Sequence, residues 1–394
     1  MSSSEIPQDA AARVASIDVA RGLVMVLMAI DHVRVYAGVP AYSADPAVFF
    51  TRWVTHFCAP AFVFLAGTSA FLYGERRRDV SALGWWLVSR GAWLILLELT
   101  LVRVAWTFNL QFGRYMLAGV LWMLGWCMIL MAALVRLPLG VIATIGLAIV
   151  AGHNLTALVP RERLHALVEG DLGWLFKILY FGGGLGGGEN PSFLVLYSLV
   201  PWIGVMATGY AFGALLRRDP VRRRRACLAI GLGAVAAFLV LRSFNLYGDR
   251  PWAGSDEMPG WLAFLNTTKY PASLLFLLMT LGPLIASLPL LEGIRGRLGR
   301  WLAVFGRVPF TFYLLHIPLI HALAVLISLF RTPEATAWLF QDHPLRPGPV
   351  PAGYVWSLGL LYGVTAVVVV ALYFPCRRVA QLKAHGLHPW LRYI

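Results

Sequence analysis

The chain has 394 residues, of which 59% are hydrophobic and only 13% are charged, and its mean hydropathy is +0.70. A soluble domain carries about a quarter charged residues, so this composition excludes an ordinary soluble enzyme and predicts an all-α polytopic membrane protein. The formal net charge of +14 could indicate a nucleic-acid-binding protein. The positions of the basic residues in the chain give a different explanation of this charge.

Apolar segments recur along the whole chain and predict about ten transmembrane helices. They are separated by short polar connections, and the segment at 139–152 is short. A polar leader at 1–15 precedes the transmembrane domain at 16–376, and a basic tail at 377–394 follows it. The ten segments are 16–37, 50–73, 80–102, 115–135, 139–152, 193–216, 226–244, 267–290, 301–330 and 352–376.

Lys and Arg are distributed unevenly among the connections. The N-terminus, the C-terminal tail and every second connection together hold 18 of the 33 Lys and Arg residues, whereas the other connections hold eight. The richest clusters are "ERRRD" and "RRDPVRRRR". Short cytoplasmic loops of membrane proteins carry such an excess. We therefore predict that both termini are cytoplasmic and that the protein does not bind nucleic acid.

The first apolar segment, "SIDVARGLVMVLMAIDHVRVYAG" at 16–38, contains five ionisable side chains: Asp18, Arg21, Asp31, His32 and Arg34. A charge in hydrocarbon costs at least about 2.5–3.5 kcal/mol, so such residues usually face a bundle interior and mark a pathway or a site. Arg21 and His32 are eleven residues apart, so they share a helix face and lie roughly 16 Å apart along its axis. Arg21 is then near the cytoplasm, with Asp18 one turn away as a possible partner, and His32 is in the outer half.

Other predicted helices also carry ionisable residues. The second segment enters the membrane from the outside, which places His56 at about the depth of His32. The two imidazoles could therefore lie close together, although either could be a structural histidine bonded to a carbonyl group. "FGRVPFTFYLLHIPLIH" has Arg307 near its cytoplasmic end and His316 near mid-depth. Lys269 starts its segment at the outer surface, where it could simply extend toward the interface.

Several remaining features favour structural roles. Arg90 and Glu98 are expected to form structural ion pairs with neighbours. The four cysteines lie in or beside predicted helices, with the spacing of neither a disulfide framework nor a zinc site. The stretch "FGGGLGGGENPS" lacks the Lys-Ser/Thr of a phosphate-binding loop and favours a hinge or a re-entrant segment.

Five motifs occur in order along the chain: "SIDVARGLVMVLMAIDH", "CAPAFVFLAGTSAFL", "YSLVPWIGVMATGYAFG", "KYPASLLFLLMTLGP" and "FGRVPFTFYLLHIPLIH". Together, from about residue 13 to the C-terminus, they resemble the bacterial DUF1624 proteins of the heparan-α-glucosaminide N-acetyltransferase-like family of transmembrane acyltransferases. The spacing Arg21-x10-His32 is also similar to the first-helix motif of the acyltransferase-3 family, in which the histidine is regarded as catalytic.

The resemblance implies that 16–376 is a transmembrane acyltransferase domain. Such an enzyme moves an acyl group, usually acetyl, from cytoplasmic acyl-CoA to a hydroxyl or amine of an extracytoplasmic acceptor, often a sugar. It gives His32 the catalytic position, as a general base or as a carrier of the acyl group, and Arg21 a donor-side role. The implied partners are the lipid bilayer, acetyl-CoA and a glycan-type acceptor, and the implied location is a bacterial inner membrane. A homodimer is a further expectation.

The residue types suit this chemistry without a metal. Attack on a thioester needs a base with a near-neutral pKa, donors for the oxyanion and cations for the phosphates of coenzyme A. A proton-coupled transporter is the competing hypothesis, because aligned Asp, His and Arg residues also serve such carriers, and a non-catalytic scaffold is a third. We predict that His32, His56 and Asp31 are catalytic residues. Arg21, Arg307 and His316 are predicted to bind the cofactor, and Lys269 and Trp202 are predicted to bind the acceptor.

Overall fold

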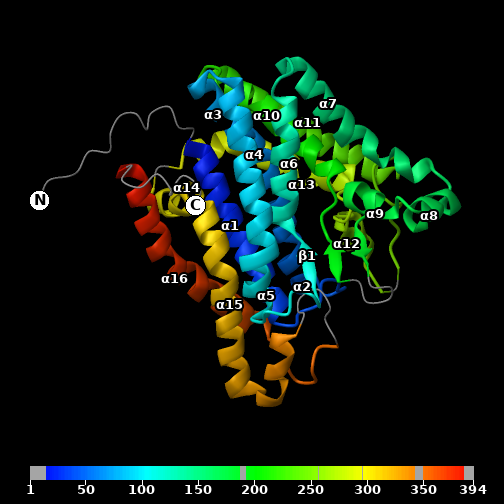
Figure 1. Cartoon of the computed structure of the whole chain (residues 1–394), viewed down its shortest axis with the longest axis vertical. Helices are drawn as coiled ribbons and strands as arrows, with labels where there is room; N and C mark the ends of the chain where they lie inside the picture. Colours follow the sequence, from blue (N-terminus) through cyan, green and yellow to red (C-terminus); the bar gives the residue numbers. More distant parts are fainter. Residues whose placement is uncertain (1–14, 187–191, 256, 295, 342–348, 386–394) are drawn as a thin grey trace, which may run out of the picture.

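The computed structural model describes residues 15–186, 192–255, 257–294, 296–341 and 349–385, and most of these residues form helices gathered in one bundle (Figure 1). The α-helices are α1 (Ala15–Tyr36), α2 (Pro46–Trp53), α3 (Cys58–Arg77), α4 (Val80–Leu97), α5 (Arg103–Thr107), α6 (Val120–Leu134), α7 (Leu139–Gly152), α8 (Arg161–Glu169), α9 (Gly173–Phe176), α10 (Val200–Leu216), α11 (Pro220–Ser243), α12 (Gly260–Leu265), α13 (Leu274–Glu292), α14 (Arg297–Arg307), α15 (Pro309–Arg331) and α16 (Leu358–His385). Short 3₁₀-helices lie at η2 (Val54–Phe57), η4 (His153–Leu158) and η6 (Pro333–Phe340), and π-helical turns lie at η3 (Glu98–Val102) and η5 (Lys177–Phe181).

Six helices in the described residues are long and apolar enough to cross a membrane, and two others, α6 and α10, are apolar but shorter. These helices indicate a membrane-embedded protein, as the composition predicted. The ten-span topology and the cytoplasmic termini stay predictions, although α1 begins and α16 ends on the same side of the bundle (Figure 1). The six candidates are Pro46–Arg77, Leu139–Leu158, Pro220–Ser243, Leu274–Glu292, Pro309–Arg331 and Leu358–His385.

The prediction of an all-α protein was wrong in one region. A three-stranded sheet is formed by β1 (Met116–Ala118), β3 (Phe193–Val195) and β2 (Gly183–Leu185), in that order, with β1 parallel and β2 antiparallel to β3. Two predicted helices therefore begin later than expected, at α6 and α10. A short apolar run has no periodicity that separates strand from helix, and its pairing partner comes from elsewhere in the chain.

The predicted segment 301–330 is divided into two helices. α14 ends at Arg307 and α15 begins at Pro309, while Val308 between them is not helical. Proline has no backbone N–H, and its ring disfavours helical geometry in the residue before it. The break lets α14 lie against α1 and α15 approach α1 separately.

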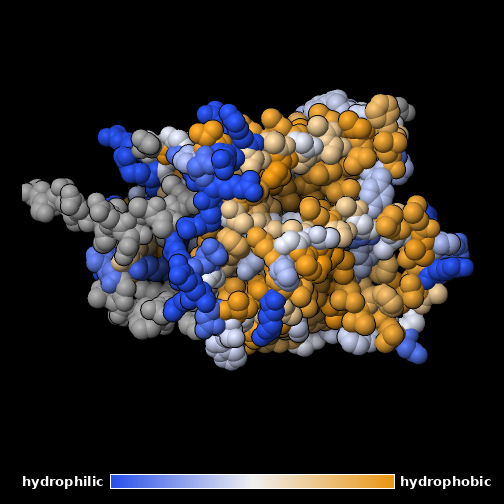
Figure 2. All heavy atoms as spheres, turned by 90° about the horizontal axis from the view of Figure 1, so that it is seen from above, coloured by the Kyte–Doolittle hydropathy of each residue, from blue (hydrophilic) through white to orange (hydrophobic). Residues whose placement is uncertain are grey.

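Helix α1 is the centre of the bundle. It contacts α3, α13, α14, α15 and α16, and Ala29, Val33 and Tyr36 on it have no exposed surface. Hydrophobic side chains of peripheral helices stay exposed, as lipid-facing residues do, among them Leu232 on α11. Figure 2 shows one end of the bundle, with hydrophilic residues gathered on one side and a broad hydrophobic surface over much of the rest.

Helices α3 and α10 approach each other closely at two glycines. A Cβ atom on Gly67 would overlap the carbonyl oxygen of Met206, and one on Gly209 would overlap that of Phe64. Thr68 donates from Oγ1 to the carbonyl oxygen of Gly209 at 2.9 Å. Small residues let membrane helices come this close, so these positions set the distance between the two helices.

The substitution Gly67→Leu is expected to lower the free energy of unfolding by at least about 1–3 kcal/mol, because the added side chain forces α3 and α10 apart. The thermal denaturation midpoint in detergent, followed by size-exclusion chromatography, measures the effect. Gly233→Leu on α11 is the control, since a Cβ there meets nothing within 4 Å. Equal midpoints for the two variants would contradict the close contact.

Candidate functional site

His32 on α1 and His316 on α15 are in direct contact in the bundle interior. His32 Nδ1 and His316 Nε2 are 2.6 Å apart, and the rings stack with centroids 4.8 Å apart. His316 is fully buried, whereas His32 keeps partial exposure. The bundle thus joins two histidines that the sequence analysis had assigned separate roles, and it leaves one of them accessible.

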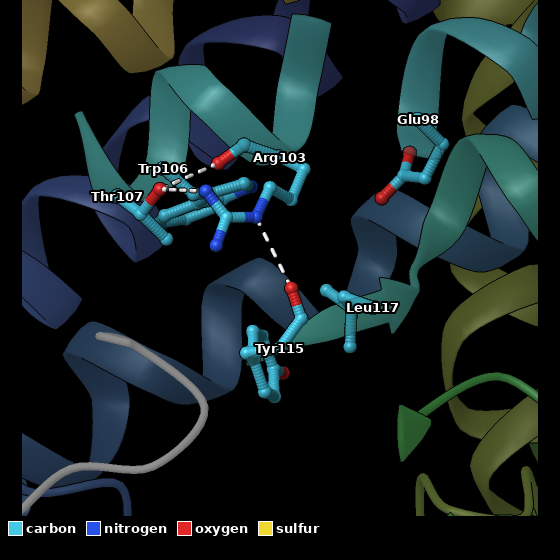
Figure 3. A pocket seen from close by; sticks show the side chains of 6 residues that line it. All are labelled: Glu98, Arg103, Trp106, Thr107, Tyr115 and Leu117. Carbon is cyan, nitrogen blue, oxygen red and sulfur yellow. Dashed lines mark hydrogen bonds between the residues drawn. The ribbon is translucent and has the colours of Figure 1, made fainter. Parts of the chain in front are cut away.

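Trp106 of α5 packs against His32. The two rings meet edge to face with centroids 4.9 Å apart, and Tyr36 Oη donates to the carbonyl oxygen of Trp106 at 2.8 Å. Trp106 also borders a cavity of about 10 Å³, which is room for about one water molecule and too small for a substrate. Figure 3 shows the lining residues of this cavity: Glu98, Arg103, Trp106, Thr107, Tyr115 and Leu117.

Glu98 and Arg103 beside this cavity have structural roles. Glu98 Oε2 accepts a hydrogen bond of 3.0 Å from the backbone N–H of Leu121, in the first turn of α6. The predicted ion pair of Glu98 was wrong, because its carboxylate, within the described residues, satisfies an otherwise free N–H of a helix terminus. Arg103 is buried and donates to the carbonyl oxygens of Tyr115 at 3.1 Å and Gln111 at 2.7 Å, which shapes the loop after α5.

Asp31 lies next to His32 in the sequence and pairs along its own helix. Its Oδ1 is 3.0 Å from Arg34 Nε, and Arg34 also donates from Nη1 to the carbonyl oxygen of Val39 at 2.8 Å. The carboxylate keeps 22% exposure. This pair fixes the turn that ends α1 and places one negative and one positive charge beside the histidine pair, while the predicted catalytic role of Asp31 stays a prediction.

Lys269 lies in the loop before α13, on the same side of the site as Asp31. Its side chain is partly buried, and Nζ is 5.3 Å from the centroid of the Tyr270 ring. An ammonium group at this position can donate hydrogen bonds to a polar acceptor. The acceptor-binding role predicted for Lys269 stays a prediction.

Hydrogen bonds outside the site hold this loop in place. The carboxylate of Asp249 accepts from Thr268 N at 2.8 Å, from Thr268 Oγ1 at 2.6 Å and from Ser273 Oγ at 2.8 Å. His153 Nε2 is 2.8 Å from the carbonyl oxygen of Ala272. The role of Asp249 could not be predicted from the sequence, because a single Asp in a polar loop carries no periodic or motif signal.

His56 does not contact His32 in the described structure. It is 3% exposed, its ring lies 5.5 Å from that of Phe276, and neither of its nitrogens has a hydrogen-bond partner among the described residues. A buried polar group without a partner costs about 1–3 kcal/mol. His56 is therefore ready to bond to a ligand or a water molecule, and its predicted catalytic role stays a prediction.

The opposite end of α1 carries the predicted donor-side residues. Arg21 donates from Nη2 to the carbonyl oxygen of Leu65 at 2.9 Å and to Ser69 Oγ, both on α3. Arg307 Nε lies 4.0 Å from Asp18 Oδ2, and the Arg307 side chain is 49% exposed. Because α1 is continuous over its whole length, this cationic end stays roughly 16 Å from the histidine pair along the helix axis.

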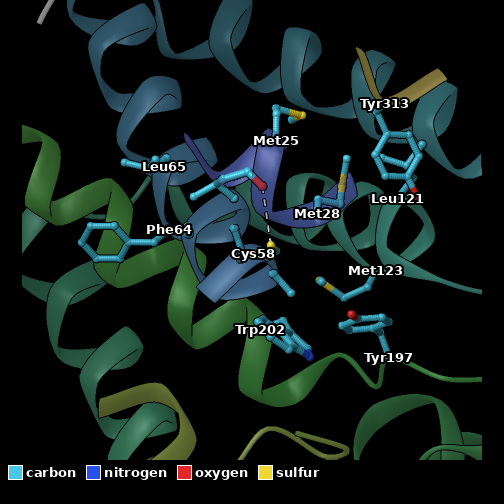
Figure 4. Close-up of a cluster of buried hydrophobic side chains, with 14 of the residues drawn as sticks. Met25, Met28, Cys58, Phe64, Leu65, Leu121, Met123, Tyr197, Trp202 and Tyr313 are labelled. Atoms are coloured by element: carbon cyan, nitrogen blue, oxygen red, sulfur yellow. Dashed lines mark hydrogen bonds between the residues drawn. The ribbon is translucent and has the colours of Figure 1, made fainter. Parts of the chain in front are cut away.

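Trp202 lies in the hydrophobic core. It is 1% exposed, its ring is 5.6 Å from that of Tyr197, and both residues belong to a cluster of buried hydrophobic side chains (Figure 4). The acceptor-binding role predicted for Trp202 stays a prediction, and the structure gives this residue a packing role. No group of three or more His, Cys, Asp or Glu residues lies close enough to hold a metal ion in the described part of the chain.

Comparison with known families adds an independent finding. The model of a family described as heparan-alpha-glucosaminide N-acetyltransferase, catalytic, matches residues 13–247, which is more than half of the chain. The matched range includes Arg21, His32 and His56 and ends before Lys269 and His316. No curated protein matches the chain.

The substitution Asp249→Ala is expected to lower the free energy of unfolding by about 1–3 kcal/mol, because three polar groups in the loop before α13 lose their acceptor. Asp249→Asn keeps an acceptor oxygen and is expected to fall between the alanine variant and the wild type. Thermal denaturation midpoints of the detergent-solubilised proteins check this order. Asp171→Ala at an exposed position is the control, and a midpoint for Asp249→Ala equal to that of the control would contradict the role of Asp249.

Proposed function

Because the chain belongs to the heparan-α-glucosaminide N-acetyltransferase family, we propose that it is an integral-membrane acetyltransferase that uses cytoplasmic acetyl-CoA. Membership in this family implies an acetyltransferase, and the family uses acetyl-CoA as its donor. The proposed acceptor is a hydroxyl or amine of an extracytoplasmic molecule, most simply a sugar or glycan. The proposed location is a bacterial inner membrane, with ten spans and cytoplasmic termini.

The observation that carries the proposal is the arrangement of polar groups along α1. A partly exposed imidazole, His32, lies near one end of the helix, and the cationic residues Arg21 and Arg307 lie at the other. Coenzyme A has a phosphate-rich nucleotide end and a long pantetheine arm that ends in the thioester. Cations favour the phosphates, and the arm can extend along α1 toward the histidine.

His32 acts as the general base in this proposal. The acceptor N–H or O–H gives its proton to a ring nitrogen of His32 while the acceptor heteroatom attacks the thioester carbonyl carbon. The tetrahedral intermediate then expels the sulfur of coenzyme A, the C–S bond breaks, and the proton passes from His32 to that sulfur. The products are free coenzyme A and the acetylated acceptor, so no oxidant, reductant or metal is consumed.

Two further residues have acceptor-side roles in this proposal. Lys269 lies partly buried in the loop before α13 and can donate to a polar group of the acceptor or to the developing oxyanion. His56 has two buried ring nitrogens without a hydrogen-bond partner among the described residues, so a bound acceptor can satisfy one of them. Both residues come from elements other than α1, so in this proposal the acceptor contacts more than one element of the bundle.

The substitution His32→Ala is expected to lower the acetyl-transfer rate by about 10²–10⁴-fold, because the base is lost. Acetyl-CoA binding is expected to change by less than about twofold, since the phosphates bind elsewhere. Transfer of labelled acetyl groups to glycan and amine acceptors by purified protein measures the first effect, and equilibrium binding measures the second. His165→Ala, at an exposed position on α8, is the control. Full activity of a folded His32→Ala protein would refute the proposed base.

The substitution Arg307→Ala is expected to weaken acetyl-CoA binding by about threefold to tenfold, the effect of losing one charge-assisted contact at a half-exposed position. Arg307 tests the donor site better than Arg21, because Arg21 is also bonded to α3. Equilibrium binding of labelled acetyl-CoA at fixed ionic strength measures the change.

The control for this measurement is Arg161→Ala, an exposed arginine on α8. An unchanged dissociation constant for Arg307→Ala would remove Arg307 from the donor site. If the wild-type protein bound neither acetyl-CoA nor coenzyme A, the acetyltransferase proposal itself would fail and a transporter would become the better explanation.

A further inference from the structure

We infer that His316 is a positioning residue, which holds His32 in the tautomer that carries the lone pair on Nε2. The inference rests on the proposed function, because it assigns a role relative to His32 as the base. It differs from the cofactor-binding role that the sequence predicts for His316, and it makes the histidine pair one unit in which only His32 meets the substrate.

The backbone of α15 determines which nitrogen of His316 carries hydrogen. His316 Nδ1 lies 2.6 Å from the carbonyl oxygen of Tyr313 and 3.1 Å from that of Phe312. A carbonyl oxygen only accepts hydrogen bonds, so Nδ1 must be the N–H group. A neutral imidazole has a single N–H, and the lone pair of His316 is therefore on Nε2.

The lone pair of His316 in turn determines which nitrogen of His32 carries hydrogen. Its Nδ1 is 2.6 Å from His316 Nε2, which is an acceptor, so His32 Nδ1 must be the donor. The lone pair of neutral His32 is consequently on Nε2. This nitrogen has no hydrogen-bond partner among the described residues, and it is not fully buried by them. It is therefore the atom that can take a proton from the acceptor.

A protonated His316 would reverse the arrangement, because its Nε2–H would donate to His32 Nδ1 and leave the hydrogen on His32 Nε2. The surroundings disfavour that state. His316 has no exposed surface, and no carboxylate contacts it among the described residues. The charged groups near the pair are Asp31 and Arg34 on α1 and Lys269 before α13, of which two are cations. A third cation buried beside them would be costly.

The arrangement also serves the protonated state of His32 that forms during transfer. When Nε2 takes the proton of the acceptor, Nδ1–H still donates to His316 Nε2, so no rotation of either ring is needed. Without His316, neutral His32 can carry its hydrogen on either nitrogen, and the fraction with hydrogen on Nε2 cannot act as a base. His316 therefore increases the fraction of competent enzyme without contacting the substrate.

Two substitutions of His316 separate this role from simple packing. In His316→Gln the side-chain amide oxygen can accept from His32 Nδ1, whereas His316→Leu leaves no acceptor. We expect kcat for acetyl transfer by the full-length protein to fall by about 10–100-fold in His316→Leu and by less than about tenfold in His316→Gln. The KM for acetyl-CoA is expected to stay within about twofold in both. If His316→Leu instead raised this KM and left kcat unchanged, His316 would bind the donor and the inference would be overturned.

The tautomer itself can be measured without any substrate. In wild-type protein labelled with ¹⁵N-histidine, the nitrogen spectrum of His32, assigned by its absence from His32→Gln, is expected to show hydrogen on Nδ1 and a lone pair on Nε2. Hydrogen on Nε2 of wild-type His32 would overturn the inference even if His316→Leu failed to fold. A correct tautomer together with a fully active His32→Ala protein would instead refute the proposed function and leave the tautomer assignment intact.

Discussion

Helix α1 cannot face hydrocarbon, because each of its charged side chains would cost at least about 2.5–3.5 kcal/mol there. The rest of the bundle satisfies this constraint by surrounding the helix with α3, α13, α14, α15 and α16. Arg21 hydrogen-bonds to α3, Asp18 lies near Arg307 of α14, and His32 bonds to His316 of α15. Each neighbouring helix that supplies such a partner is thereby fixed against α1 at a particular depth.

The same constraint connects stability to the proposed chemistry. A continuous helix with polar groups near both ends is a rigid spacer, so the arginines proposed to bind the donor and the histidine pair keep their separation without a moving domain. On the apolar part of α1 between them, Met25 and Met28 are buried in the core (Figure 4), whereas Leu23 is 40% exposed. The peripheral helices expose apolar side chains, such as Leu232 on α11, and these match a lipid environment.

Several segments that are not regular α-helix lie next to the residues of the site. The π-helical turn η3 precedes the segment that carries Trp106, the break at Val308 precedes the helix that carries His316, and the loop before α13 carries Lys269. Backbone groups freed by such irregularities must find partners inside the protein when they lie at membrane depth. Loop carbonyls accept from Arg103, and Asp249 accepts from a loop N–H. The irregular segments therefore extend contacts to the site from elements that regular helices alone would not bring there.

The sequence by itself determined what depends on local geometry and composition: a membrane protein of many helices, and a first helix with Arg21 and His32 on one face. Helical rise and twist are the same in any context, so an eleven-residue spacing fixes that register before any other helix is placed. Only the tertiary structure decided that His316, 284 residues away along the chain, meets His32, that His56 does not, and that short apolar runs form a sheet. Such contacts depend on how deep each helix lies and at what angle it crosses its neighbours, and these quantities come from packing of the whole bundle, which no single segment encodes.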